Sequence, residues 1–129
     1  MGLFKLFSRS AAMILAVSLA TATAAAGEVD VMAVDARQAA DGSWTFSVTL
    51  RHDDEGWDHY ADRWDVVGPD GTVYGERVLL HPHVEEQPFM RGLSGVAIPE
   101  GVHSVIVRGH DKVHGLGGAE LTIDLQAGE

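Results

Sequence analysis

Residues 43–51, SWTFSVTLR, alternate polar and apolar side chains without interruption. The apolar positions of this stretch are Trp44, Phe46, Val48 and Leu50. Because successive side chains of a β-strand point to opposite faces of the sheet, the alternation predicts a strand with one buried face. The preceding residues ADGS at 40–43 are typical of a tight turn. The chain is therefore expected to contain a sheet that covers a hydrophobic core.

Six further segments have the length and composition of strands, and turn signals separate several of them. They cover residues 29–37, 63–67, 72–80, 93–98, 102–108 and 119–125. No window of the chain has a convincing helical period. Seven short strands in about 100 residues predict an all-β fold, namely a seven-stranded antiparallel sandwich of the immunoglobulin or fibronectin type III kind.

The N-terminal segment 1–26 has the three-part pattern of a secretory signal peptide. Two basic residues precede the apolar run AAMILAVSLA, and small residues follow it. This run is shorter than the roughly 20 apolar residues that span a bilayer. Cleavage is expected after Ala26, which would make Gly27 the first residue of a single mature domain, 27–129, or after Ala24. The domain is then expected to be periplasmic or secreted, with no membrane insertion after signal cleavage.

The composition excludes several kinds of partner. The chain has 19 acidic and 9 basic residues, and its formal net charge is −10 at pH 7. Nucleic acids and anionic membrane surfaces are not expected partners, because both are bound through Lys and Arg. The chain has no cysteine, which excludes disulfides and metal binding through thiolates.

Six of the seven histidines lie in three short segments between predicted strands. The segments are HDDEGWDH at 52–59, HPH at 81–83 and HDKVH at 110–114. Consecutive antiparallel strands alternate in direction, so the second, fourth and sixth connections lie at the same end of a sandwich. The six imidazoles and several carboxylates are therefore expected at one end, where loops on a rigid scaffold often bind ligands.

Imidazole is the commonest protein ligand of metal ions such as zinc and copper, and carboxylates can complete the coordination sphere. In the HPH unit, Pro82 favours an extended backbone in which His81 and His83 point to the same side. The candidate metal ligands are His81, His83, His114, His59, Glu85, His52 and His110. The expected ion is Cu(II) or Zn(II). The alternative is a structural or pH-responsive network in which carboxylates pair with the imidazoles.

The segment 56–64, GWDHYADRW, is unusually rich in aromatic residues for a loop. Trp64 begins a predicted strand and is expected in the core. Trp57 and Tyr60 either pack the loop down or line a binding cleft, and Phe89 is expected to plug the end of the core. These aromatic residues support an alternative function, a non-catalytic interaction module that contacts a protein or envelope component through aromatic and acidic loops.

An enzymatic function is not expected. Ser94 and Ser104 lie in predicted strands and not in the sharp turn that exposes a nucleophile. The run GLGG at 115–118 precedes a predicted strand, whereas a phosphate-binding loop precedes a helix. These glycines are expected to turn the last hairpin with positive φ angles.

Two stretches of the sequence resemble known proteins. Residues 105–111, VIVRGHD, with the glycine-rich loop that follows, resemble the penultimate strand and final loop of fibronectin type III-like domains. The run 52–118, with GWDHYADRW, PDG, HPHVEEQPF and VHGLGG, resembles small secreted proteobacterial proteins of unassigned function. The resemblance implies an exported sandwich and does not indicate which activity the protein has. With the histidines, it predicts an exported protein that stores, delivers or senses a divalent transition-metal ion.

Overall fold

The computed structural model describes residues 15–19 and 27–125. Its regular elements are nine strands: β1 (Leu15–Leu19), β2 (Asp30–Gln38), β3 (Trp44–Arg51), β4 (Ala61–Val67), β5 (Val73–Val78), β6 (Phe89–Val96), β7 (Ser104–Asp111), β8 (Gly115–Leu116) and β9 (Leu121–Asp124). The described residues contain no helix, and thus no helix that is long and apolar enough to cross a membrane.

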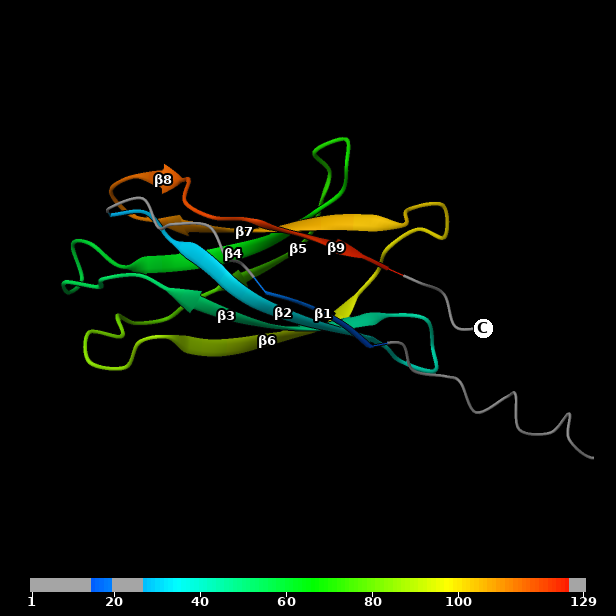
Figure 1. Ribbon diagram of the computed structural model, residues 1–129, viewed down its shortest axis with the longest axis horizontal. Coiled ribbons are helices and arrows are strands. Elements are labelled where there is room, and N and C mark those ends of the chain that lie inside the picture. Colours follow the sequence, from blue (N-terminus) through cyan, green and yellow to red (C-terminus); the bar gives the residue numbers. More distant parts are fainter. Residues whose placement is uncertain (1–14, 20–26, 126–129) are drawn as a thin grey trace, which may run out of the picture.

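The strands form two sheets that lie face to face, and all neighbouring strands are antiparallel (Figure 1). One sheet has the order β1-β2-β3-β6. The other has the order β5-β4-β7, and both β8 and β9 pair with β7. The chain therefore passes from one sheet to the other after β3, β5 and β6.

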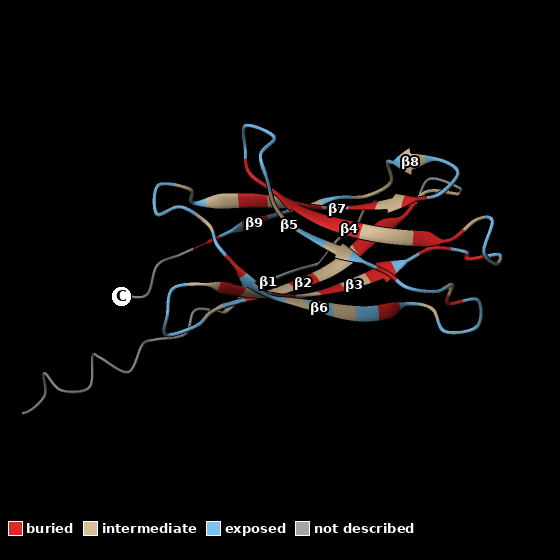
Figure 2. Cartoon of the chain, turned by 180° about the vertical axis from the view of Figure 1, so that it is seen from behind, coloured by how far each residue is buried: buried red, intermediate tan, exposed pale blue. Residues whose placement is uncertain are grey.

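The hydrophobic core lies between the sheets. Burial along β3 alternates strictly, and its four apolar side chains are at most 4% exposed. Trp64 on β4 is fully buried, which confirms that it is a core residue. Figure 2 shows buried residues recurring along the strands, while many of the residues in the connections are exposed. Each large apolar side chain buried in this way contributes roughly 1.5–3 kcal/mol relative to an exposed one.

The all-β class is confirmed, and each of the seven predicted strands is present with bounds that differ by a few residues. The predicted strand count was wrong, because β1 and β8 were not expected. β8 has two residues, too few to produce a pattern in the sequence. Gly115, at its start, and Gly118, after its end, have the expected positive φ, 72° and 75°. β1 lies within 1–26 and pairs with β2. The signal peptide and its cleavage stay predictions.

The three long connections that carry histidines lie at one end of the sandwich, at the left in Figure 1. We call this the histidine end. The turns that join β2 to β3 and β6 to β7 lie at the opposite end (Figure 1). Hydrogen bonds link the three connections directly: the His83 amide donates to Asp54 Oδ2 over 2.6 Å, and His52 Nε2 lies 3.0 Å from Asp111 Oδ2. The expected gathering of these loops is therefore confirmed.

Candidate metal centre

His52 follows β3 directly and continues the inward-facing series of that strand, two positions after Leu50. Its side chain is buried at the histidine end of the core, and 3% of the residue is exposed. Its Nδ1 lies 2.6 Å from Asp54 Oδ1, and its Nε2 lies 3.0 Å from Asp111 Oδ2. The same Nε2 lies 3.2 Å from the carbonyl oxygen of Gly27. Both ring nitrogens of His52 thus face oxygen atoms.

His59 reaches the same point from the connection between β3 and β4. Gly56 and His59 form an isolated bridge, and Gly56 has a φ of 135°, a conformation that favours glycine. The His59 ring lies edge-on to the His52 ring, with centroids 4.9 Å apart. Its Nδ1 lies 3.1 Å from Glu55 Oε1, and its Nε2 lies 3.4 Å from Asp111 Oδ2. The His59 side chain is 15% exposed, so solvent reaches the group from this side.

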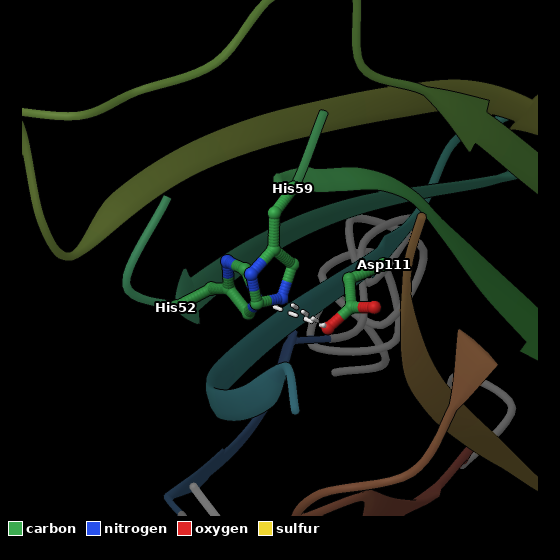
Figure 3. Close-up of side chains that lie close together, drawn as sticks. All are labelled: His52, His59 and Asp111. Carbon is green, nitrogen blue, oxygen red and sulfur yellow. Dashed lines mark hydrogen bonds and ion pairs between the residues drawn. The ribbon is translucent and has the colours of Figure 1, made fainter. Parts of the chain in front are cut away.

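Asp111 ends β7 and is fully buried. Its Oδ2 faces Nε2 of His52 and of His59 (Figure 3), and it lies 3.2 Å from Nδ1 of His114. Its Oδ1 accepts hydrogen bonds from the backbone N–H groups of Val113 and His114. Burial raises the pKa of Asp111, but the hydrogen bonds from His114, Val113 and His52 outweigh burial and lower the pKa from 3.8 to about 2. Asp111 is therefore a buried anion at neutral pH.

The spacing of these atoms fits a small metal ion. Within residues 15–19 and 27–125, the ligand atoms of His52, His59 and Asp111 all lie within 4.8 Å of one another. The carbonyl oxygen of Gly27 is a fourth candidate, 3.2 Å from one Nε2 and 3.4 Å from the other. Ligands about 2.0–2.1 Å from a tetrahedral ion are themselves about 3.3–3.4 Å apart. The separations of 3.0–3.4 Å between these nitrogen and oxygen atoms are close to that value.

The hydrogen-bond pattern requires a proton or a metal ion on both ring nitrogens of each histidine. Each Nδ1 faces a carboxylate, that of Asp54 for His52 and that of Glu55 for His59. Each Nε2 faces the oxygens of Asp111 and Gly27, which can only accept. With Nδ1 donating, each Nε2 must carry a second proton or bind a metal ion. A carboxylate that holds the Nδ1–H group is a common outer partner of a ligating histidine.

The pKa values agree with this pattern. Burial lowers the pKa of His52, but the carboxylates of Asp54 and Asp111 outweigh burial and raise it overall. The hydrogen bond with Glu55 is the largest cause of the raised pKa of His59. We call His52, His59, Asp54, Glu55 and Asp111 the acidic cluster. Its carboxylates favour a cation at the two imidazoles.

The structure places His81 and His83 beside each other, with ring centroids 4.5 Å apart. The His83 ring stacks on Phe89 at 4.0 Å, and its Nε2 lies 2.8 Å from an N–H group of Arg91. A guanidinium group can only donate, so this Nε2 is an unprotonated acceptor. Burial, then the charges of Arg91 and His81, lower the pKa of His83. We call His81, His83, Phe89 and Arg91 the stacked group. In it, His83 is a neutral packed side chain with Nε2 already engaged.

Of the three remaining candidate ligands, one lies beside the acidic cluster and two lie elsewhere. His114 adjoins the cluster, with its ring centroid 5.0 Å from that of His59. His110 lies on β7, where its Nδ1 is 2.6 Å from Asp62 Oδ1. Glu85 is exposed in the connection between β5 and β6. Of the seven candidates, the structure thus brings His52 and His59 into one group with a shared carboxylate, and it places His114 beside them.

Four of the participating residues were absent from the ligands predicted from sequence: Asp111, Asp54, Glu55 and Gly27. The alternation of buried positions along β3 and β7 could have indicated two of the site residues, His52 and Asp111. The inward-facing series of β3 continues to His52, and that of β7 continues through Gly109 to Asp111. An ionisable residue at the next inward position after a core strand is a candidate for a buried site. No comparable pattern pointed to Gly27.

The aromatic residues of the histidine end have different environments. Tyr60 and Phe89 are buried, at 8% and 4% exposure, and Phe89 thus lies in the core as expected of a plug. Trp57 is 62% exposed, although its ring contacts that of Tyr60 edge-on at 5.7 Å. Trp57 and Tyr60 therefore do not form an exposed aromatic pair.

No protein-family model and no solved structure matches the chain. A protein of Halomicrobium mukohataei named "Putative lipoprotein" is 44% identical to the chain over 101 residues. The matched region is 78% of this chain and 49% of that relative. The chain thus spans about half the length of the relative it matches.

Proposed function

We propose that the protein is exported and that its histidine end binds one divalent transition-metal ion, Cu(II) or Zn(II). The ligands are Nε2 of His52, Nε2 of His59 and Oδ2 of Asp111, and His114 lies close enough to complete the site. One observation carries the proposal. Both Nε2 atoms converge on one buried carboxylate oxygen, while a separate carboxylate holds each Nδ1.

The arrangement of the ligand atoms around Asp111 favours a metal ion over two protons. Asp54, Glu55 and Asp111 surround the two imidazoles. A single divalent ion would satisfy both Nε2 atoms and Asp111 Oδ2 at once, whereas two protons would crowd the same oxygen. Imidazole with carboxylate suits Zn(II) and Cu(II). Since His59 is partly exposed, an ion could enter and leave the site, as storage, delivery and sensing all require.

Export rests on the sequence and on the relative. The pattern of segment 1–26 predicts a signal peptide, and the name of the Halomicrobium mukohataei relative describes a lipoprotein. The strand orders β2-β3-β6 and β5-β4-β7-β9 support an immunoglobulin or fibronectin type III-like sandwich. A periplasmic or secreted location follows from the proposed export.

Elemental analysis of the protein tests the metal site. The chain is exported to a periplasm, purified without a histidine tag, and compared with His59→Ala and Asp111→Asn variants. We expect about one Cu or Zn per chain, lost in both variants, and a melting temperature that EDTA lowers and added ion restores. His103→Ala, at an exposed position outside the cluster, is the matched control and keeps the metal. Absence of metal, together with melting that is insensitive to Cu(II) and Zn(II), would refute the proposal.

A second candidate function, an interaction module, has its own supporting observation. Apolar side chains at the histidine end are 41–74% exposed: Trp57, Leu80, Val84, Val113 and Leu116. An envelope protein could dock on them next to the metal site. Loss of retention on an envelope fraction in a Trp57→Ala/Val113→Ser variant, with the metal content unchanged, would support this second function.

A further inference from the structure

The main chain at Gly27 lies inside the candidate metal centre. Its carbonyl oxygen is 3.2 Å from His52 Nε2 and 3.4 Å from His59 Nε2. This oxygen therefore faces the same small volume as Asp111 Oδ2. Gly27 is also the residue that the predicted cleavage after Ala26 would make the first of the mature chain. The predicted processing point and the candidate metal centre thus coincide in space.

Cleavage before Gly27 would change the chemistry of its nitrogen. In the uncut chain this nitrogen belongs to a peptide bond, whose lone pair is delocalised into the carbonyl group, and it is a poor metal ligand. After cleavage it is a primary amine with a free lone pair once deprotonated, and its ordinary pKa is about 7.7–8.0. The amine and the carbonyl oxygen of one residue can chelate a single ion in a five-membered ring. Processing would thus add a nitrogen ligand at the site.

We propose that removal of segment 1–26 completes the metal site, because the α-amino nitrogen of Gly27 becomes a ligand beside His52, His59 and Asp111. The inference rests on the metal site proposed above and deepens it. The ion is then bound tightly after export and processing, and weakly by the uncut chain. Metal loading is in this way confined to the compartment where the signal peptide has been removed.

Several hydrogen bonds made by residues after Gly27 hold this end of the chain against the site. Glu28 Oε1 accepts a hydrogen bond from the Gly118 amide over 3.2 Å, and Asp30 Oδ1 accepts one from the Ala119 amide over 2.7 Å. A backbone hydrogen bond from the Val31 amide to Ala119 follows. These contacts lie after the cleavage point and persist when the bond before Gly27 is cut.

The main chain at position 27 passes so close to the His114 ring that only glycine fits there. A Cβ added to Gly27 would lie 2.5 Å from Cε1 of His114, closer than real Cβ contacts. Any larger residue would push the main chain away from the His114 ring or displace that ring. The same packing that brings the Gly27 carbonyl to His52 and His59 therefore depends on the absence of a side chain.

Two exported forms that differ by two residues test the inference. One begins at Gly27, and the other keeps Ala25 and Ala26 through a shifted cleavage position; mass spectrometry verifies both N-termini. Cu(II) affinity is measured by competition with a chelator, and nitrogen coordination by electron paramagnetic resonance of the Cu(II) complex. We expect the form that begins at Gly27 to bind at least about tenfold more tightly. Its spectrum should show one more coupled nitrogen than that of the extended form.

Three outcomes separate the two proposals. Tighter binding and an extra nitrogen in the Gly27 form support the inference, provided that matching melting curves of the metal-free forms show that both are folded. Equal affinity and equal nitrogen coupling, with binding lost in His59→Ala of both forms, overturn the inference and leave the metal site standing. Absence of Cu(II) binding in both folded forms overturns the inference together with the proposed function.

Discussion

His52 and His83 are almost equally buried, at 3% and 5% exposure, and both lie in connections at the same end of the sandwich. Their neighbours differ. His52 faces Asp54 and Asp111, and its pKa is raised although burial lowers it; His83 packs on Phe89 beside Arg91, and burial with that charge lowers its pKa. The comparison teaches that neighbouring charges, and not burial, decide which of two buried imidazoles is suited to hold a cation.

Asp54 connects the acidic cluster to the stacked group, so its removal should have the largest effect on both. Its oxygens accept hydrogen bonds from His52, the Ala61 amide and the His83 amide. We expect Asp54→Ala to lower the free energy of unfolding by about 3–5 kcal/mol, as for other broken buried charge pairs. Urea denaturation of metal-free protein measures this. The neighbouring exposed Asp53→Ala is the control, and a loss below about 1 kcal/mol in Asp54→Ala would contradict the expectation.

The next test separates metal binding from packing. His59→Ala should abolish metal binding but change the free energy of unfolding of the metal-free protein by less than about 1 kcal/mol, because the side chain is partly exposed. His83→Ala should keep the metal but cost about 1–3 kcal/mol, because it leaves a gap against Phe89. Elemental analysis measures the metal content of both variants, and urea denaturation measures their free energies of unfolding. Loss of metal in His83→Ala with native spectra would erase the distinction between the two groups.

The pH dependence of the metal-free protein should have opposite signs in the two groups. His52 and His59 have raised pKa values when folded, so their stabilisation is present below the unfolded pKa of about 6.5 and is lost as the pH rises through the folded values. The pKa of His83 is lowered, so its stabilisation is present above about 6.5 and is lost as the pH falls.

Denaturation midpoints at about pH 5, 6.5 and 8 measure this effect, which should be smaller than the losses above. His83→Ala should flatten the acidic side of the profile, and His59→Ala should reduce the fall on the alkaline side. Added Zn(II) should also counter the alkaline fall, because it binds neutral imidazole. If the denaturation midpoints of both variants and the parent change with pH in the same way, these histidines do not govern the pH dependence of stability.

Trp57→Ala should have the smallest effect of these substitutions on stability and metal content. The residue is 62% exposed, and its loss should change the free energy of unfolding by at most about 0.5 kcal/mol. Differential scanning calorimetry and elemental analysis check both quantities. A clear loss of metal would mean that Trp57 supports the His59 turn, and the metal site would then extend further into this connection than the contacts indicate.

Much of the fold follows from local patterns in the sequence. The alternation in 43–51 correctly predicted β3, and Pro-Asp-Gly at 69–71 lies in the turn between β4 and β5. The start of β6 at Phe89 was missed, because Met90, Arg91 and Gly92 break the apolar alternation. β8 was missed because two residues carry no period.

By itself, the sequence determined the strand alternation and, through the antiparallel order, the gathering of six histidines at one end. Both depend on neighbours along the chain and on simple topology. The tertiary structure decided that His52 meets Asp111, 59 residues away, and the Gly27 carbonyl, 25 residues away, whereas His83 meets Phe89 and Arg91. The charge state and ligand capacity of an imidazole are set by atoms within a few ångströms in space, and residue spacing in a loop does not specify those atoms.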